Sequence, residues 1–199
     1  MNEISIQKQI LRKHFKEIRS LLNDKEVIKK SNLICENFLH NLLFNITEFQ
    51  NKTFGIYYSA MNEVKTDLLR DYFIANKIVF AFGKINFKTD CLDFIKYEHN
   101  QTFISNVKYN KIFEPLTGQI IIPDFIVTPL LAFDSKLNRL GMGMGYYDRT
   151  IANLYNHNSK IKTIGLAYDF QESNTILPHE KHDSRLDFIA TEKKVFFLN

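Results

Sequence analysis

Short segments rich in β-branched and aromatic residues alternate with segments of helical periodicity along this chain of 199 residues. Strands that alternate with helices favour a mainly parallel sheet covered on both faces. We therefore expect an open-sheet α/β fold with three layers, α/β/α, forming a single domain over residues 1–199. The predicted strands are residues 53–58, 78–82, 92–97, 125–128, 162–167, 187–190 and 195–198.

Helices are expected before and between these strands. Apolar residues recur at helical spacing through residues 5–22, which predicts an amphipathic helix. Asn23 or Asp24 can cap a second helix directly after it. The apolar face of that second helix is predicted to contain Val27, Leu33, Ile34, Phe38 and Leu42. Further helices are predicted at residues 67–75 and 146–155.

Composition limits the classes of partner. The net charge is only +4, and no compact block of Lys and Arg stands out, so no nucleic-acid partner is expected. No apolar run approaches the roughly 20 residues that span a membrane, and the N-terminus lacks the apolar core of a signal peptide. Cys35 and Cys91 lie far apart, as is typical of reduced thiols. We expect a monomeric, cytoplasmic protein.

Three of the seven glycines stand at every second position in residues 139–148, Arg-Leu-Gly-Met-Gly-Met-Gly-Tyr-Tyr-Asp, and a predicted helix follows at once. A glycine-rich turn before a helix presents unpaired backbone N–H groups and the positive end of the helix dipole, which suits a phosphate. The segment is neither a Walker A loop nor a dinucleotide-binding fingerprint, because the spacing of its residues fits neither motif. The sequence therefore predicts an anion-binding glycine loop of another kind.

Residues 139–149 resemble the signature of the 5-formyltetrahydrofolate cyclo-ligase family, roughly Arg-Leu-Gly-x-Gly-x-Gly-(Tyr/Phe)-Tyr-Asp-Arg. Further segments resemble that family in the same order along the chain. They are residues 8–12, 58–66, 123–134, 165–171, 177–178 and 182–183. The chain departs from the family pattern at Met142, at Met144 and at Phe82-Gly83, where a Pro-Arg pair is expected. The resemblance nevertheless extends over nearly the whole chain.

Four basic residues, Lys8, Arg12, Lys16 and Arg19, fall on one face of the first predicted helix, opposite its apolar stripe. By itself this pattern is typical of a solvated basic face, and we expect Lys16 and Arg19 to be exposed. Lys8 and Arg12 belong to the first resembling segment, which implies that they bind the phosphates of ATP. A guanidinium group can bind phosphate oxygens through two parallel hydrogen bonds.

The resemblance implies one site for ATP and for a folate. The implied ATP-binding residues are Lys8, Gln9, Ile10, Leu11, Arg12, Arg139, Leu140, Gly141, Met142, Gly143, Met144, Gly145, Tyr146 and Tyr147. The implied folate-binding residues are Tyr58, Glu63, Tyr146 and Gln171. The residues that the resemblance implies for catalysis are Arg12, Tyr147 and Asp148.

Structural roles stay open for several of these residues. Tyr146 and Tyr147 are neighbours on a predicted helix, where adjacent side chains point about 100° apart, so the two must differ in exposure and either could be a core aromatic. Gln171 could be a buried amide. Asp148 lies near the start of a helix, where the dipole favours a carboxylate in any case.

The resemblance also implies that Asp148 and Asp183 approach a Mg²⁺ ion. Magnesium on ATP keeps several waters and takes one or two carboxylates, so two aspartates are sufficient. Residues 179–183, His-Glu-Lys-His-Asp, raise zinc as an alternative. The His-Glu-x-x-His spacing is absent, and we do not expect zinc.

The implied activity is the ATP- and Mg²⁺-dependent conversion of 5-formyltetrahydrofolate to 5,10-methenyltetrahydrofolate. ADP and phosphate are released, and the reaction passes through a phosphorylated formyl intermediate. The alternative is a non-catalytic folate- or nucleotide-binding module on the same scaffold. Such a module need not keep both Asp148 and Asp183, so the presence of both favours the enzyme.

Overall fold

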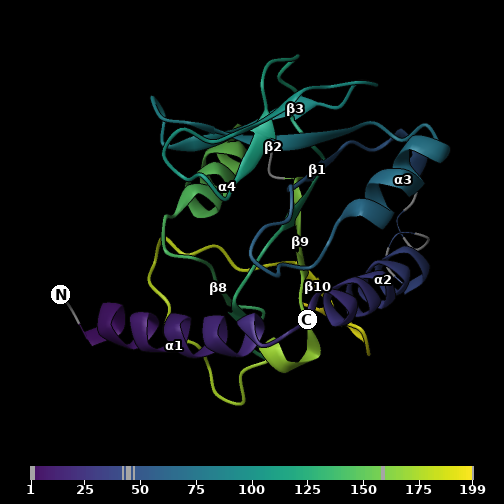
Figure 1. Cartoon of the computed structure of the whole chain (residues 1–199). Coiled ribbons are helices and arrows are strands. Elements are labelled where there is room, and N and C mark those ends of the chain that lie inside the picture. Colours follow the sequence, from purple (N-terminus) through teal and green to yellow (C-terminus); the bar gives the residue numbers. More distant parts are fainter. Residues whose placement is uncertain (1–2, 42, 44–45, 47, 158–159, 199) are drawn as a thin grey trace.

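The computed structural model describes residues 3–41, 43, 46, 48–157 and 160–198. Its centre is a seven-stranded sheet with the strand order β11-β10-β9-β6-β1-β2-β3 (Figure 1). The strands are β1 (Phe54–Ile56), β2 (Phe80–Asn86), β3 (Cys91–Lys96), β6 (Phe125–Thr128), β9 (Lys162–Leu166), β10 (Phe188–Ala190) and β11 (Val195–Phe197). Neighbours from β10 to β2 are parallel, and the edge strands β3 and β11 pair antiparallel. The predicted open, mainly parallel sheet is confirmed.

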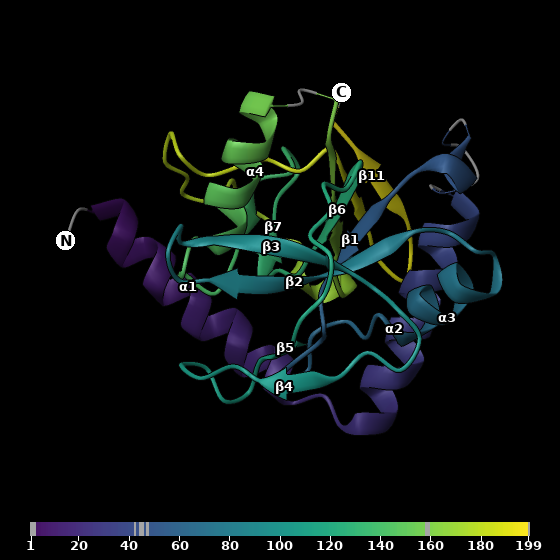
Figure 2. The same ribbon diagram turned by 90° about the horizontal axis from the view of Figure 1, so that it is seen from above.

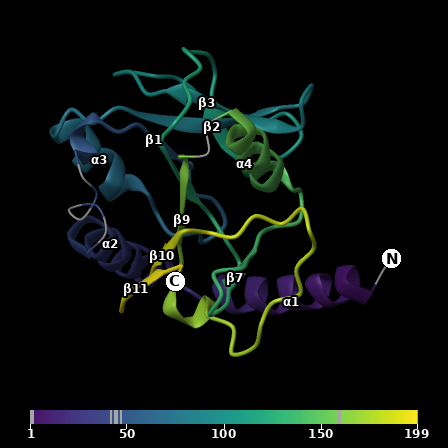
Figure 3. The ribbon, with the colours of Figure 1, turned by 180° about the vertical axis from the view of Figure 1, so that it is seen from behind.

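Helices cover both faces of this sheet, with α2 and α3 on one side and α4 on the other (Figures 1 and 3). The helices are α1 (Glu3–Ser20), α2 (Asp24–Asn41), α3 (Asp67–Ala75) and α4 (Tyr146–His157). Successive residues of a strand point to opposite faces, and β2 shows the result. Phe80 and Phe82 join the apolar cluster that includes α2 and α3, whereas Ala81 packs with Ile151 of α4. The three-layer arrangement is therefore confirmed.

The first helix lies across one end of the sheet (Figure 2). Its Phe15 packs in a cluster with Leu131 and Leu140. The prediction of an exposed Arg19 is wrong, because its side chain is buried at 2% exposure and its Nη1 donates a hydrogen bond to the carbonyl of Leu130 at 3.3 Å. A loop after β1 lies against the end of α1, where Asn62 Nδ2 donates to the carbonyl of Arg19. The helix therefore contacts protein on two sides at its C-terminal end.

Several short elements had no counterpart among the predicted ones. They are β4 (Phe103–Ser105), β5 (Phe113–Pro115), β7 (Ala132–Phe133), β8 (Arg139–Leu140) and the 3₁₀ turns η2 (Phe49–Asn51) and η3 (Asp169–Gln171). Strand β2 extends beyond its predicted end because it pairs with β3 as far as Asn86. Leu33 is exposed rather than part of the buried face of α2, and Leu42 lies outside the described residues.

Two observations bear on the expectations drawn from composition. No helix within the described ranges is long and apolar enough to cross a membrane. Both cysteines are free thiols. Burial raises the pKa of Cys35 to about 12, which keeps this thiol protonated and unreactive at neutral pH.

Candidate functional site

A cavity of about 870 Å³ opens where the carboxyl ends of β1 and β6 lie side by side. In parallel sheets ligands bind beyond these ends, because the loops that follow neighbouring strands meet there. The loop after β1 supplies residues 57–63, and the β7–β8 hairpin after β6 leads into the glycine loop. Helix α1, residues 180–185 and residues of β2, β3, β5 and α4 line the other sides. The cavity therefore collects segments from both halves of the chain.

The glycine loop, residues 141–145, has a backbone that requires glycine at two positions. Gly143 has φ of 97° and Gly145 has φ of 72°, a region that other residues rarely adopt. A Cβ at Gly143 would stand 3.1 Å from Cζ of Arg12, and one at Gly145 would stand 2.5 Å from Nη1 of Arg149. The loop thus packs directly against two guanidinium groups, which places positive charge at the start of α4.

Helix α1 presents Lys8 and Arg12 to the cavity, one turn apart. Arg12 Nε donates a hydrogen bond to the carbonyl of Gly141 at 3.0 Å. Burial lowers the pKa of Arg12, and the carboxylates of Asp183, Asp148 and Glu180 act in the opposite direction. Arg12 therefore lies between the glycine loop and the acidic groups of the site.

Lys8 is buried and links α1 to the loop at residues 180–183. Its Nζ forms ion pairs with Glu180, at 2.9 Å, and with Asp183. Burial alone would raise the pKa of Asp183, but hydrogen bonds from Lys8 and from the backbone N–H of Glu180 lower it. Asp183 is therefore ionised at neutral pH.

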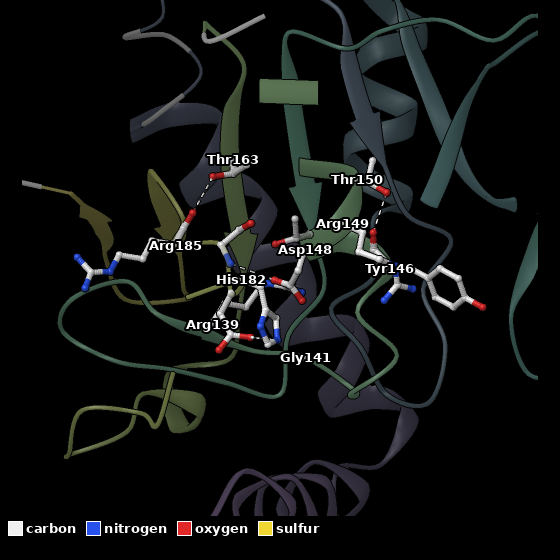
Figure 4. A network of polar contacts seen from close by, with 12 residues as sticks. Arg139, Gly141, Tyr146, Asp148, Arg149, Thr150, Thr163, His182 and Arg185 are labelled. Atoms are coloured by element: carbon white, nitrogen blue, oxygen red, sulfur yellow. Dashed lines mark hydrogen bonds and ion pairs between the residues drawn. The ribbon is translucent and has the colours of Figure 1, made fainter. Parts of the chain in front are cut away.

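Asp148 forms a second ion pair, part-buried, with Arg139, and both residues are labelled in Figure 4. Arg139 Nη2 lies 2.6 Å from Asp148 Oδ1, and the backbone N–H of Ser184 donates to the same oxygen at 3.2 Å. Among the residues that the structure describes, the buried Nε of Arg139 has no hydrogen-bond partner. This unpartnered donor beside the cavity fits an anionic ligand.

The carboxylates offer oxygen ligands of the kind that Mg²⁺ takes. Asp148 and Asp183 both line the cavity. In the described part of the chain, Glu180, His182 and Asp183 have possible ligand atoms within 4.8 Å of one another, and that group does not include Asp148 or His179. The donor chemistry fits magnesium, although both aspartates are held by cationic side chains.

The adjacent tyrosines at the start of α4 have different surroundings, as their positions predict. Tyr146 is buried, and its hydroxyl lies 3.4 Å from that of Tyr109. This contact, together with burial, raises the pKa of Tyr146 to about 12. Figure 4 shows its ring pointing away from Asp148. Tyr147 is partly exposed in the cavity, and burial, followed by the charge of Glu63, raises its pKa.

The opposite wall of the cavity is aromatic and carries one acid. Tyr58 is 42% exposed, and its ring centroid lies 5.3 Å from Phe103 and 5.6 Å from Phe113. Glu63 is only 8% exposed, and its Oε2 accepts a hydrogen bond from the backbone N–H of Ala60 at 2.9 Å. Burial raises the pKa of Glu63. A flat ring with polar N–H groups fits this wall.

Four residues of the predicted site do not line the cavity. Gln9 and Ile10 lie on the exposed face of α1, and Leu11 packs against the cluster around Phe15. Gln171 is 1% exposed, and its amide is engaged by the backbone, as Nε2 donates to the carbonyls of Leu130 and Leu131 and Oε1 accepts from Tyr168. The structure therefore corrects the prediction that Gln171 contacts the folate. Its role is to hold buried backbone groups in place.

Replacing Gln171 by alanine is expected to lower the free energy of unfolding by about 1–3 kcal/mol, because it leaves buried backbone groups unpaired. The KM for a folate substrate should stay unchanged. Urea unfolding and steady-state kinetics measure the two effects. A raised KM without loss of stability would instead return Gln171 to the binding site.

The cavity also contains residues that the sequence prediction omitted. They include Ser5, Tyr57, Ile112, Phe113, Arg149, Glu180 and Ser184. Arg149 and Glu180 lie within or beside the resembling segments, so a closer comparison of those segments could have found them. No sequence pattern marks Tyr57, Ile112 or Phe113 as cavity residues, because the apolar residues of a pocket wall resemble those of the core.

Comparison of the sequence with known proteins gives one result. Residues 4–192 match the model of the 5-formyltetrahydrofolate cyclo-ligase family. A 5-formyltetrahydrofolate cyclo-ligase of Haemophilus influenzae is 33% identical over 184 residues, which cover 88% of this chain and 92% of that protein. A mouse protein of the same name is 28% identical over 198 residues, which cover 93% of each chain.

Two solved structures of 5,10-methenyltetrahydrofolate synthetases are also similar to this chain. A 5,10-methenyltetrahydrofolate synthetase from Mycoplasma pneumoniae has a TM-score of 0.72 at 25% identity, covering 94% of this chain and 99% of the other. The NMR structure of Aquifex aeolicus 5,10-methenyltetrahydrofolate synthetase has a TM-score of 0.76 at 26% identity, covering 96% of this chain and 93% of the other. The similarity includes the sheet and the segments around the cavity, since it extends over nearly the whole chain.

Proposed function

The chain belongs to the 5-formyltetrahydrofolate cyclo-ligase family, and we propose that it converts 5-formyltetrahydrofolate to 5,10-methenyltetrahydrofolate with ATP and Mg²⁺. The observation that carries this proposal is the composition of one cavity. A glycine loop with cationic side chains forms one side, and an aromatic wall with a buried acid forms the other. Both substrates can therefore bind in contact.

The triphosphate is assigned to the side of the glycine loop. Helix α4 begins directly after the glycine loop, and the first N–H groups of a helix have no partner within the helix. Arg12 lies against Gly143 on the same side. Lys8 adds a second cation from the same helix. These groups neutralise the charge that develops as the γ-phosphoryl group is transferred.

The folate is assigned to the side of Tyr58 and Glu63. Rings of the substrate can pack on Tyr58, whose own ring is supported by Phe103 and Phe113. The Glu63 carboxylate can accept hydrogen bonds from N–H groups of the pterin. Ala60 holds that carboxylate in place through its backbone N–H.

The proposed reaction has two steps. The formyl oxygen on N5 attacks the γ-phosphorus of ATP, and the bond between that phosphorus and the bridging oxygen breaks to release ADP. N10 then attacks the activated formyl carbon and loses its proton to solvent, and the C–O bond breaks to release phosphate. Phosphorylation is needed because the oxygen of a formamide is a poor leaving group. The contribution of the protein is orientation and neutralisation of charge.

Tyr147 lies between the two sides of the cavity. Burial raises the pKa of its hydroxyl, Glu63 raises it further, and Arg139 lowers it. A protonated hydroxyl at this position can donate a hydrogen bond to an oxygen of the formyl or phosphoryl group. This is the catalytic role proposed for Tyr147.

Magnesium is assigned to Asp148 and Asp183. When bound, the ion supplies positive charge to the phosphate oxygens. Arg139 and Lys8 orient these two carboxylates through their ion pairs. A cytoplasmic, monomeric protein without a nucleic-acid partner remains our expectation.

Replacing Arg12 by alanine is expected to raise the KM for ATP by about 10- to 100-fold, the effect of one lost charge-assisted contact. The KM for 5-formyltetrahydrofolate should change much less, because Arg12 lies against the glycine loop. Steady-state kinetics with each substrate varied in turn measure both values. Lys16→Ala, an exposed change on the same helix, is the control. An equal rise in both KM values would contradict the assignment of Arg12 to ATP.

The phosphorylated intermediate can be tested with an isotope. With oxygen-18 in the formyl group of the substrate, the label is expected in the released phosphate, because the formyl oxygen becomes a phosphate oxygen. Mass spectrometry of the phosphate detects it. Unlabelled phosphate formed together with the methenyl product would exclude this route.

A further inference from the structure

Lys8 has partners of two kinds within reach of its ammonium group. Its side chain is 7% exposed, and Nζ forms ion pairs with Glu180, at 2.9 Å, and with Asp183. Lys8 also lines the cavity, one turn of α1 away from Arg12, which lies against Gly143 of the glycine loop. Lys8 is therefore bound to carboxylates while it lies close to the side assigned to the triphosphate.

The two carboxylates belong to a turn that the backbone holds closed without Lys8. Asp183 Oδ2 accepts the backbone N–H of Glu180 at 2.6 Å, and the backbone N–H of Asp183 donates to the carbonyl of Glu180 at 3.0 Å. Oxygens of both side chains lie within 4.8 Å of one another. The turn thus offers two oxygens at a spacing that a single cation can bridge.

The ammonium group of Lys8 is the movable member of this cluster, because it is carried on a flexible four-carbon chain. Arg12 is held more firmly, since its Nε donates to the carbonyl of Gly141. Lys8, Glu180 and Asp183 together carry one positive and two negative charges, and this excess of negative charge opposes the approach of a polyphosphate. A divalent ion in place of the ammonium group would make the carboxylate pair neutral and release Lys8.

We propose that Lys8 exchanges partners when ATP and Mg²⁺ bind, leaving Glu180 and Asp183 to the metal ion and pairing with the phosphates instead. The inference rests on the proposed function, since ATP and Mg²⁺ are the ligands exchanged. Until the nucleotide arrives, Lys8 competes with the metal ion for the two carboxylates. ATP and metal therefore bind the protein cooperatively, because each takes away a partner that competes with the other.

Lys8→Met tests the competition directly. Without the ammonium group, the variant is expected to bind Mn²⁺ in the absence of nucleotide about tenfold more tightly than wild type, or more, the effect of one competing charge-assisted contact. Electron paramagnetic resonance of free Mn²⁺ during a titration measures the affinity. Lys16→Met removes an exposed charge from the same helix and should bind Mn²⁺ as wild type does. Equal Mn²⁺ affinity of Lys8→Met and wild type would overturn the proposal.

Glu180→Gln tests the exchange from the side of the nucleotide. The variant loses one carboxylate partner of Lys8, so ATP should bind more tightly in calorimetric titrations with EDTA present. Part of any gain comes from lower repulsion, and the same change in a Lys8→Met background measures that part. The gain should be about threefold larger, or more, when Lys8 is present, within the range of coupling between residues in contact. Equal gains in both backgrounds would contradict the exchange.

Thermal unfolding covers the loss of stability that Lys8→Met causes. Removing one partner of a buried ion pair is destabilising, but a metal ion that binds the folded state restores stability. Mn²⁺ should therefore raise the Tm of Lys8→Met more than that of wild type. A variant that stays unfolded in saturating Mn²⁺ would assign Lys8 to structure alone and overturn the proposal.

None of these measurements requires turnover, so the two proposals can fail separately. Wild type that shows the expected Mn²⁺ and ATP affinities but forms no methenyl product would contradict the proposed function and leave the exchange intact. Wild type that forms the product while Lys8→Met binds Mn²⁺ no more tightly than wild type would contradict the exchange alone.

Discussion

Gly143→Val is expected to abolish measurable ATP binding, with a loss of about 100-fold or more in affinity. The positive φ of 97° strains any residue with a side chain, and a Cβ would meet the Arg12 guanidinium at 3.1 Å. Relief of that contact moves Arg12 or the loop, and either movement disrupts the backbone N–H groups that face the phosphates. Two or more lost contacts to a charged ligand, at about 1.5–3 kcal/mol each, account for the expected loss.

Calorimetric titration with ATP measures this effect, and Gly143→Ala provides a graded control. Alanine has the same backbone strain, of about 1–3 kcal/mol, with less bulk, and should give an intermediate affinity. Binding of 5-formyltetrahydrofolate should persist in both variants, because the folate side lies across the cavity. Unchanged ATP affinity in Gly143→Val would exclude the glycine loop as the phosphate site.

Asp148→Asn is expected to lower kcat by about 100-fold or more, in the range found when one stabilising group of a transition state is removed. Asparagine keeps an oxygen that can accept the hydrogen bonds of Arg139 and Ser184. The fold should therefore persist while the charge that holds Mg²⁺ is lost. The Mg²⁺ concentration that gives half-maximal activity should rise.

Magnesium titrations of the initial rate measure that change. Asp71→Asn serves as the matched control, because Asp71 forms an ion pair with Arg70 on the surface of α3, away from the cavity. This control should show wild-type rates and magnesium dependence. Full activity of Asp148→Asn at unchanged magnesium dependence would remove Asp148 from the metal site.

The main features of the sheet could be predicted because its strands are short local segments rich in apolar residues. The four residues of β6, Phe125–Thr128, are all buried, which is why an uninterrupted apolar segment marks them. The hairpin of Ala132–Phe133 with Arg139–Leu140 could not be predicted in the same way. Strands of two residues show no periodicity, and their pairing depends on the turn between them.

Single residues whose partners are distant in sequence were the main source of error. Arg19 continues the basic spacing of Lys16, yet only Arg19 is covered by the loop that contains Asn62. Gln171 is bound by the carbonyls of Leu130 and Leu131, a contact that no local pattern encodes. The glycine loop was identified because its chemistry is contained in one segment. The ion pairs of Lys8 with Glu180 and Asp183 were not predicted, because they join residues far apart in the sequence.

The central claim is that one cavity couples ATP to closure of the folate ring. The most direct measurement is the absorbance of the methenyl product when the purified protein is mixed with 5-formyltetrahydrofolate, ATP and Mg²⁺, each omitted in turn. We predict a signal that requires all three components and is lost in Gly143→Val. Binding of ATP or folate without any absorbance change would contradict the claim and indicate a non-catalytic binding module on the same scaffold.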